Sequence, residues 1–249
     1  MNFFFNRHRY SFRDVGMTTD IHCHILPGVD DGAGNMDSSV EIFERLYNAG
    51  VKQIVLTPHV SKGIYPNTTQ ILVSGFALLA DFIPVNLKDA LSLKLGAEYM
   101  IDDYFEEITD PLVYRNNTIL IEMSYSSRSS NIMDVVFNLL NKGYNPILAH
   151  PERYVFYQGP GHHTPNRLQE LEKLVDMGCA LQLNIQSLTG SYGEGSLKVL
   201  KYLLDHDYYS YIATDIHSAG QFDLFKDFKV NSSQFEKIRQ LAVNNDRLF

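Results

Sequence analysis

Residues 118–150 read TILIEMSYSSRSSNIMDVVFNLLNKGYNPILAH and contain the repeating unit of the fold. Two short runs of apolar and β-branched residues, 118–123 and 145–149, are typical of buried strands. Between them, 131–142 is predicted to be a helix that ends where Gly143 favours a left-handed cap. A strand, a helix and a second strand in succession predict two parallel strands joined by a helical crossover.

The same alternation extends along the chain in both directions. Strands are predicted near residues 18–22, 51–57, 93–98, 118–123, 145–149, 179–184 and 209–214. Helices are predicted at 37–49, 68–82, 131–142, 165–177 and 196–206 and near 232–243, with Gly50 and Gly178 as further caps. No GxGxxG or GxxxxGK[ST] motif opens a helix, so a nucleotide-binding open sheet lacks support. We therefore predict a single-domain α/β fold, a distorted (β/α)7 TIM-like barrel, with an open doubly wound sheet as the alternative.

Composition excludes several classes of protein. The chain has 249 residues, of which 45% are hydrophobic and 20% charged, as in a globular domain with a sizeable core. Its net charge of −8 and the lack of a cationic stripe argue against nucleic acid as the main partner. Two cysteines form no disulfide framework, which agrees with a reducing compartment. We find no membrane span and no apolar stretch of a secretory signal, so we expect a cytoplasmic protein.

The first 16 residues lie outside the repeating pattern. They begin MNFFFNRHRYSFRD and are aromatic and basic, with arginines at positions 7, 9 and 13. We predict that 1–16 form an arm that packs over the bottom of a barrel domain at 17–249. A contact with an anionic surface, such as a membrane or a membrane-bound partner, and an oligomer contact are the alternatives.

Residues of the metal-binding type stand at the end of a predicted strand or in the loop that follows. They are His22, His24, Asp31, His59, Glu98, Glu122, His150, Asp215 and His217. The ends of parallel barrel strands meet on one face, and His-x-His and Asp-x-His each place two side chains on the same side of a strand. One such residue alone would more often be a hydrogen-bonded histidine or a helix cap. Nine together predict a metal site, in which Glu122 could instead orient a histidine ligand.

Imidazole and carboxylate ligands without thiolate suit Mn²⁺, Fe or Zn²⁺. Nine ligands are too many for one ion, so we expect two or three ions with a bridging carboxylate. Such a site would be locally positive and would favour a phosphorylated substrate. Arg153 lies three residues after the predicted ligand His150 and is therefore expected to bind phosphate oxygens. Neither Cys23 nor Cys179 begins the C-x₅-R motif of cysteine phosphatases, and no GxSxG motif is present. The side chain of Cys23 is expected to point away from the ligands.

Five motifs together resemble the polymerase-and-histidinol-phosphatase (PHP) superfamily. They are DIHCHILPGVDDGA at 20–33, TPH at 57–59, GAE at 96–98, AHPERY at 149–154 and TDIH at 214–217. The closest likeness is to its bacterial manganese-dependent protein-tyrosine phosphatases of capsule and exopolysaccharide operons. The resemblance covers residues 17–225, and HCHILPGVDDG is its most specific part.

The resemblance implies a distorted seven-stranded barrel of the PHP type and three metal ions, Mn²⁺ first, with Fe or Zn as alternatives. It implies that His22, His24, Glu98 and Asp215 hold the first ion, that the bridging Glu98 with Glu122 and His150 holds the second, and that Asp31, His59 and His217 hold the third. Arg153 would bind the substrate phosphate, and Asp215 and His217 would also act in catalysis. The implied reaction is direct attack by a metal-bound hydroxide, without a phosphoenzyme.

The function predicted from the sequence is that of a protein-tyrosine phosphatase, a metal-dependent phosphoric monoester hydrolase. The resemblance implies that its partner is a membrane-associated bacterial tyrosine autokinase, whose tail carries the phosphotyrosines and which controls polysaccharide export. The alternative is a small-molecule phosphatase of the same superfamily, such as one acting on histidinol phosphate. A nuclease and a barrel without activity are further alternatives, which the net charge and the complete set of ligand positions respectively disfavour.

Overall fold

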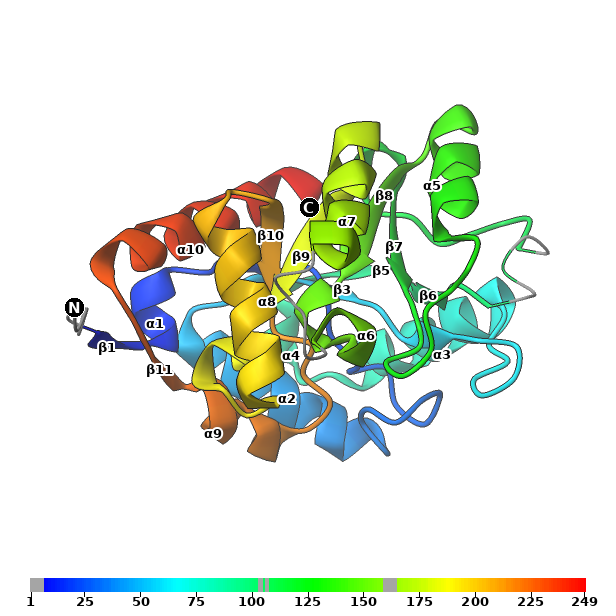
Figure 1. Cartoon of the computed structure of the whole chain (residues 1–249). Coiled ribbons are helices and arrows are strands. Elements are labelled where there is room, and N and C mark those ends of the chain that lie inside the picture. Colours follow the sequence, from blue (N-terminus) through cyan, green and yellow to red (C-terminus); the bar gives the residue numbers. More distant parts are fainter. Residues whose placement is uncertain (1–6, 103–104, 106–107, 159–164) are drawn as a thin grey trace.

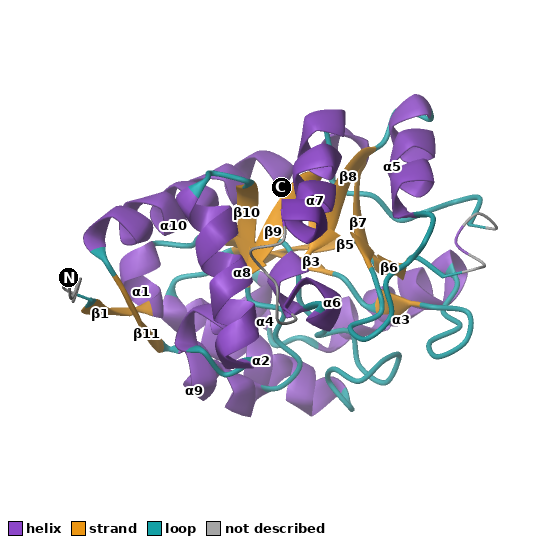
Figure 2. Cartoon of the chain, in the orientation of Figure 1, coloured by secondary structure: helices purple, strands orange, loops and turns teal. Residues whose placement is uncertain are grey.

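The computed structural model describes residues 7–102, 105, 108–158 and 165–249. Helices surround a set of parallel strands, as Figures 1 and 2 show. The strands are β1 (His8–Ser11), β2 (Thr19–Asp20), β3 (Gln53–Leu56), β4 (His59–Val60), β5 (Ser92–Leu95), β6 (Glu98–Met100), β7 (Thr118–Glu122), β8 (Asn145–Ala149), β9 (Ala180–Asn184), β10 (Tyr209–Ala213) and β11 (Asp227–Val230).

The helices confirm the predicted alternation. They are α1 (Phe12–Val15), α2 (Met36–Ala49), α3 (Thr69–Phe82), α4 (Val85–Lys88), α5 (Ile132–Asn141), α6 (Val155–Gln158), α7 (Pro165–Met177), α8 (Gly193–Asp205), α9 (Phe222–Phe225) and α10 (Ser232–Asn245). The six long helices match the six predicted ones to within a few residues. The short helices α1, α4, α6 and α9 were not predicted, because four residues are too few to show a helical period.

One predicted strand is divided in the structure. The strand predicted at 93–98 becomes β5 and the start of β6, whereas the one at 51–57 contains β3 alone, and β4 follows it at His59–Val60. Gly96 lies in the break between β5 and β6, where an added Cβ would come within 2.5 Å of the Tyr114 ring. A larger residue at this position would therefore collide with a buried aromatic side chain.

The parallel strands form two sheets that follow the chain order around a distorted barrel. One sheet has the order β10-β9-β8-β7-β6-β4, and the other has β2-β3-β5. Between the first and last strands of the barrel the ladder is reduced to an isolated bridge between Cys23 and Ile216. Two hydrogen bonds flank this bridge, from His24 N to Ile216 O at 2.9 Å and from Asp215 N to His22 O at 2.9 Å. The predicted α/β barrel type is therefore confirmed, but its ladder is not continuously closed.

Helix α2 illustrates how local sequence places an element. The Asn35 side chain caps its first turn by accepting a hydrogen bond from Ser38 N, and Gly50 ends it with a φ of 112°. Phe43 and Leu46 on its inner face are fully buried in the core. The helices and the barrel strands share one hydrophobic core, and this packing fixes the positions of the strand ends.

The described part of the N-terminal segment is integrated into the fold. Strand β1 pairs antiparallel with β11, more than two hundred residues away in the chain, as Figure 1 shows. Tyr10 stacks on Phe235 of α10 with 3.7 Å between the ring centres, and Phe12 packs on Phe225. Residues 1–6 lie outside the described residues, and the boundary between 1–16 and 17–249 stays a prediction. No helix in the described part of the chain is long and apolar enough to cross a membrane.

Candidate metal centre

The nine predicted ligands meet at the carboxyl ends of the barrel strands. Their nitrogen and oxygen atoms lie within 4.8 Å of one another in four groups. The groups are His24, Asp31, His59 and His217; His22, His150 and Asp215; His22, His24 and Glu98; and His59, Glu98 and Glu122. No predicted position is left outside the cluster. How the nine residues are divided among ions stays a prediction, since the resemblance pairs Glu122 with His150 whereas here it faces His59.

Glu98 lies at the centre of the cluster and is fully buried. Its Oε2 atom is 3.2 Å from His22 Nε2, 3.3 Å from His24 Nε2 and 3.1 Å from His59 Nδ1. Among the described residues, none of these nitrogens has the geometry of a hydrogen bond to that oxygen, and Glu122 Oε2 is likewise buried and unpartnered. Lone pairs of several atoms thus converge on a small volume, as they do around a bound cation.

Two buried side chains set which nitrogen of each histidine faces the centre. Gln182 Oε1 lies 2.9 Å from His22 Nδ1, and Asp30 Oδ2 lies 2.8 Å from His24 Nδ1. The Gln182 amide nitrogen donates to the Leu183 carbonyl, so the amide oxygen is the atom that faces His22. An amide oxygen and a carboxylate oxygen can only accept a hydrogen bond. Both Nδ1 atoms must therefore carry the proton, which leaves the Nε2 lone pairs directed at the centre.

Asp31 and His217 lie at the rim of the cluster. The Asp31 side chain is 55% exposed, with Oδ1 3.5 Å from His59 Nε2 and 3.6 Å from His217 Nε2. The neighbouring Asp30 is buried, and besides bonding His24 it accepts from the backbone N–H groups of Gly32 and His59. The two adjacent aspartates therefore differ in role: one opens toward the ligands at the rim, and the other holds a ring in place.

Burial and neighbouring charges shift the pKa values of several residues in the cluster. Burial raises the pKa of Glu122 to about 7, and the charge of Glu98 adds to this effect. Burial alone would lower the pKa of His59, yet the carboxylates of Glu98 and Glu122 raise it to about 10. Burial opposes ionisation of Asp215, but the charges of His22 and Arg153 hold its pKa well below the usual range.

The donor set fits divalent cations. It consists of five imidazoles and four carboxylates, and the buried Oε2 atoms of Glu98 and Glu122 lack hydrogen bonds from the described residues. Mixed nitrogen and oxygen ligands without thiolate suit Mn²⁺, Fe and Zn²⁺. The backbone is strained at two of the candidate ligands, where φ is 34° at His150 and 51° at Asp215. Such left-handed conformations in residues with a side chain cost about 1–3 kcal/mol and are concentrated at functional sites.

Arg153 lies beside the cluster and forms an ion pair with Asp215. Its guanidinium is held between two aromatic rings, 4.5 Å from the Tyr125 ring centre and 4.4 Å from that of Tyr192. The side chain is only 17% exposed. A planar cation that packs against two aromatic rings is well suited to bind phosphate oxygens along its edge.

Glu152 anchors the turn that carries Arg153. This buried carboxylate accepts hydrogen bonds from Asn184 N at 2.9 Å and from Ser187 Oγ and Tyr209 OH at 2.8 Å each. It thereby ties the short helix at Pro151–Arg153 to β9 and β10. The position of the Arg153 backbone is thus fixed from two neighbouring strands.

Sequence reasoning missed these supporting residues. Gln182, Glu152, Tyr125 and Tyr192 act through contacts with residues distant in the chain. Asp30 contacts His24 only six residues away and lies next to the predicted Asp31, so it alone had a local signal. The predicted orientation of one residue is confirmed. Cys23 is buried on the far side of its strand, where its thiol is directed to the Val55 carbonyl.

Comparison with known proteins finds tyrosine-protein phosphatases that match most of the chain. Tyrosine-protein phosphatase CpsB of Streptococcus agalactiae serotype III is 27% identical over 238 residues, which cover 91% of this chain and 95% of that protein. Tyrosine-protein phosphatase YwqE of Bacillus subtilis is 29% identical over 206 residues, covering 80% and 77% respectively.

Solved structures resemble the chain along most of its length. One comes from the work on YwqE of Bacillus subtilis and CpsB of Streptococcus pneumoniae, which are described as metal-dependent tyrosine phosphatases. It matches with a TM-score of 0.75 and 26% identity, covering 92% of this chain and 93% of that one. Histidinol phosphate phosphatase of Lactococcus lactis shares the fold with a TM-score of 0.54 and 18% identity, over 92% of this chain and 94% of that one.

A match to a protein family covers all the ligand positions described above. It runs over residues 18–223 and is to the family described as capsular polysaccharide synthesis, CpsB/CapC. The matched span contains His22 near its start and His217 near its end, so the candidate metal-binding cluster and Arg153 both lie within it. The chain therefore belongs to the CpsB/CapC family of capsular polysaccharide synthesis.

Proposed function

We propose that this chain is a metal-dependent protein-tyrosine phosphatase, a phosphoric monoester hydrolase that acts on phosphotyrosine in a protein. The observation that carries the proposal is the buried cluster of histidines and carboxylates with one clamped arginine at its edge. The activity of the CpsB and YwqE relatives supports it. The proposed ligands are His22, His24, Asp31, His59, Glu98, Glu122, His150, Asp215 and His217.

Divalent ions bound in the cluster would activate a water molecule and offset the negative charge of the phosphoryl oxygens. The protein's own residues orient the reacting groups. Gln182 and Asp30 keep the Nε2 atoms of His22 and His24 directed inward. Arg153 would bind a non-bridging phosphate oxygen, and its ion pair with Asp215 links the phosphate-binding group to the metal-binding group.

Access to the site suits an aromatic phosphoester. Tyr125 is 37% exposed and Tyr192 is half-buried, so that both rings border the approach to Arg153. A phenyl ring that enters beside them can pack against an aromatic face while its phosphate reaches the guanidinium. The positively charged guanidinium also stabilises charge on the phosphate before and during transfer.

The finer parts of the proposal concern the metal, the partner and the compartment. We propose Mn²⁺ as the physiological ion, with Fe and Zn²⁺ as alternatives that the same ligands would accept. We propose a membrane-associated bacterial tyrosine kinase as the phosphorylated partner, in keeping with the family's link to capsular polysaccharide synthesis. A cytoplasmic location stays a prediction of the sequence.

A direct test compares two substrates on the same preparation. Chelator-stripped protein is reconstituted with Mn²⁺, Zn²⁺, Fe²⁺ or Mg²⁺, and phosphate release from a phosphotyrosine peptide and from histidinol phosphate is measured side by side. We expect metal-dependent release from the peptide, fastest with Mn²⁺. Release from histidinol phosphate alone would keep the metal site but overturn the substrate, and no release from either compound with metals bound would overturn the enzyme.

A further inference from the structure

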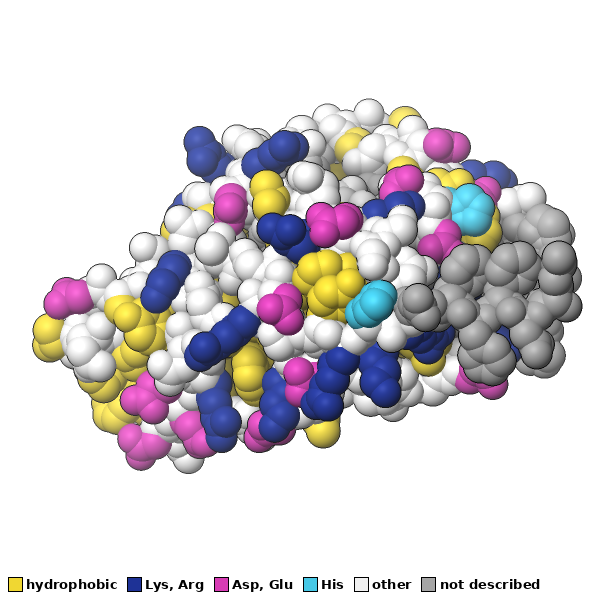
Figure 3. Space-filling view, turned by 90° about the vertical axis from the view of Figure 1, so that its left-hand side faces the viewer, with side chains coloured by type: hydrophobic (Ala, Val, Ile, Leu, Met, Phe, Trp, Pro, Cys, Tyr) yellow, Lys and Arg dark blue, Asp and Glu magenta, His cyan; other side chains and the backbone are white. Residues whose placement is uncertain are grey.

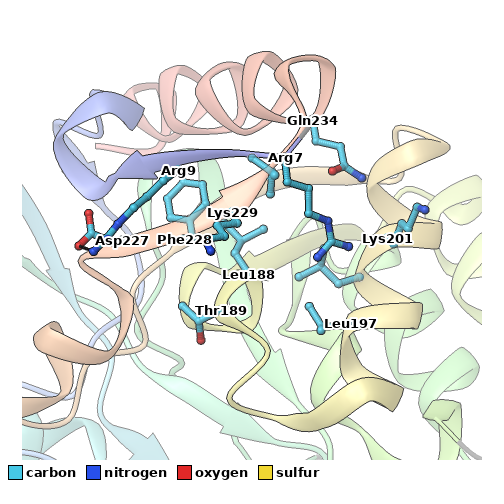
Figure 4. A pocket seen from close by; sticks show the side chains of 12 residues that line it. Arg7, Arg9, Leu188, Thr189, Leu197, Lys201, Asp227, Phe228, Lys229 and Gln234 are labelled. Carbon is cyan, nitrogen blue, oxygen red and sulfur yellow. Dashed lines mark hydrogen bonds and ion pairs between the residues drawn. The ribbon is translucent and has the colours of Figure 1, made fainter. Parts of the chain in front are cut away.

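A groove separate from the metal cluster lies between the β1–β11 ribbon and helix α8, with a volume of about 360 Å³ (Figure 4). Its floor is apolar and includes Leu188, Leu197 and Leu200. Its rim carries four cationic side chains, Arg7, Arg9, Lys201 and Lys229, and one acidic side chain, Asp227. In Figure 4 the Arg7 side chain extends across the groove from the ribbon toward α8. We call this feature the cationic groove.

The register of the ribbon concentrates positive charge on one of its faces. Arg9 lies directly opposite Lys229 in the antiparallel pair. Tyr10, the next residue, is on the other face and stacks on α10, so Arg7 shares the face of Arg9. Like charges directly opposite one another on antiparallel strands are destabilising. An anion bound between them would remove that repulsion.

Little in the protein itself neutralises this charge. Arg9 pairs with Asp227 at 2.7 Å, but in the described part of the chain Arg7, Lys201 and Lys229 form no ion pair. All three are exposed. Figure 3 shows the side of the molecule where β1 and β11 lie, and Lys and Arg side chains gather there among acidic ones. Because the whole chain has a net charge of −8, an acidic ligand would be repelled elsewhere and attracted here.

The shape and chemistry of the groove favour a peptide as the ligand. Its cations come from three separate elements and remain solvated, which suits several spaced carboxylates better than a single bound phosphate. Its leucine floor can bury apolar side chains of the same segment. The groove is concave, whereas a surface that binds a flat bilayer presents its cations outward. An acidic peptide segment with interspersed apolar residues matches all three features.

The groove and the metal centre are joined by one short stretch of chain. Asn184 donates a hydrogen bond to the Asp215 carboxylate at 2.8 Å. Thr189, five residues later, lines the groove, and Tyr192 packs against Arg153. Three residues of fully extended chain span at most about 11 Å, so Thr189 lies within that distance of Tyr192. A peptide with its phosphotyrosine at Arg153 could therefore reach the groove with a segment of fewer than about ten residues.

We propose that the cationic groove binds an acidic segment of the phosphoprotein substrate, a few residues away from the phosphotyrosine, and so selects substrates by charge. This inference rests on the proposed phosphatase activity. Surface charges of this kind act mainly on association and change affinity modestly for each pair. The groove should thus affect kcat/KM for suitable peptides and leave the chemistry at the metal centre unchanged.

The test uses the full, metal-loaded chain and two matched phosphotyrosine peptides. One peptide carries three Glu residues about six positions from the phosphotyrosine, and the other carries Gln at the same positions. We expect kcat/KM to be about tenfold higher for the Glu peptide, and this preference to disappear when Lys201→Glu and Lys229→Glu are combined. Hydrolysis of p-nitrophenyl phosphate, which is too small to reach the groove, should not change and reports that the variant is folded. Lys142→Glu combined with Lys173→Glu, which reverses the charge of two exposed lysines outside the groove, is the control for net charge.

Two other readouts separate the possible failures. Binding of the unphosphorylated Glu peptide is measured by fluorescence anisotropy at rising salt, and this tests the groove independently of catalysis. A failure to hydrolyse any phosphotyrosine peptide would count against the proposed function alone. Equal kcat/KM for the Glu and Gln peptides, or an unchanged preference in the double variant, would overturn the groove as a substrate site. Binding to anionic lipid vesicles that depends on Lys201 and Lys229, without peptide binding, would overturn it in favour of a membrane contact.

Discussion

Asp30 offers a sharp test of how the metal centre is organised. Its side chain is buried and contacts His24, but it is not itself one of the nine proposed ligands. Its carboxylate accepts three hydrogen bonds, from His24 Nδ1 at 2.8 Å, His59 N at 3.0 Å and Gly32 N at 2.9 Å. Burial raises the pKa of Asp30, but the hydrogen bond from His24, helped by those from the Gly32 and His59 backbone, lowers it to about 2, so the group is ionised throughout the neutral range. Asp30→Ala removes the acceptor that fixes the proton on His24 Nδ1, and the Nε2 lone pair is then no longer held inward.

The magnitude follows from this geometry. Loss of a group that orients a metal-binding histidine typically weakens metal affinity by about 10–100-fold, or about 1.4–2.7 kcal/mol. Asp30→Asn should fall between Asp30→Ala and the unchanged protein, because an amide oxygen can still accept from His24 but lacks the charge. The assay is a competition titration of stripped protein with Mn²⁺ and a fluorescent chelator, with thermal unfolding of the metal-free protein recorded alongside.

The control for this experiment is Asp89→Ala, which removes an exposed carboxylate at the end of α4. Its Mn²⁺ affinity should equal that of the unchanged protein. An Asp30→Ala variant that binds Mn²⁺ within about twofold of the unchanged protein would refute the orienting role. A variant that merely unfolds would be recognised by its lowered melting temperature, and the Asp30→Asn variant would then decide the question.

Further predictions concern the ligands, the arginine and protons. His22→Ala and Asp215→Asn should each remove most bound metal and nearly all turnover while the far-ultraviolet circular dichroism spectrum stays that of a folded barrel; full turnover in either variant would contradict their assignment as ligands. Arg153→Ala should lower kcat/KM for a phosphotyrosine peptide by about a hundredfold, as expected for a lost charged contact to phosphate, with metal content by mass spectrometry unchanged. Tyr192→Ala should lower kcat/KM less, by about tenfold, and Tyr192→Leu should not restore it if the ring acts through its π face rather than its bulk. Because neighbouring carboxylates raise the pKa of His59 to about 10, a proton occupies this histidine in metal-free protein below that pH and must leave when a metal binds. As the pH is lowered from 8 to 6, Mn²⁺ affinity should therefore fall by about tenfold per pH unit for each proton that the metal displaces. An affinity independent of pH would show that His59 is not a ligand.

Much of the site could be predicted from the sequence because its determinants are local. The alternation of β-branched runs with amphipathic segments sets parallel strands and helical crossovers, and strand ends in such a fold converge on one face. A ligand that follows a strand, such as His59 or His150, is placed by that rule alone. The two-residue period of an extended chain explains why His22 and His24 face the same centre while Cys23 between them faces the core.

Some properties depended on contacts that the local sequence does not encode. Pairing of β1 with β11 joins segments at opposite ends of the chain, so the predicted N-terminal arm is part of a ribbon whose cationic face no local pattern could reveal. The interruption of the barrel ladder at Cys23 and Ile216 likewise depends on how the first and last strands meet.

The sequence by itself thus determined which residues are candidate nitrogen and oxygen ligands and on which face they gather, because strand period and strand direction are local properties. Only the tertiary structure decided how those ligands are oriented. Gln182 contacts His22 across the barrel, and Tyr125 and Tyr192 close on Arg153 from separate loops. These contacts join residues far apart in the chain, and packing of the whole core fixes the distances between them.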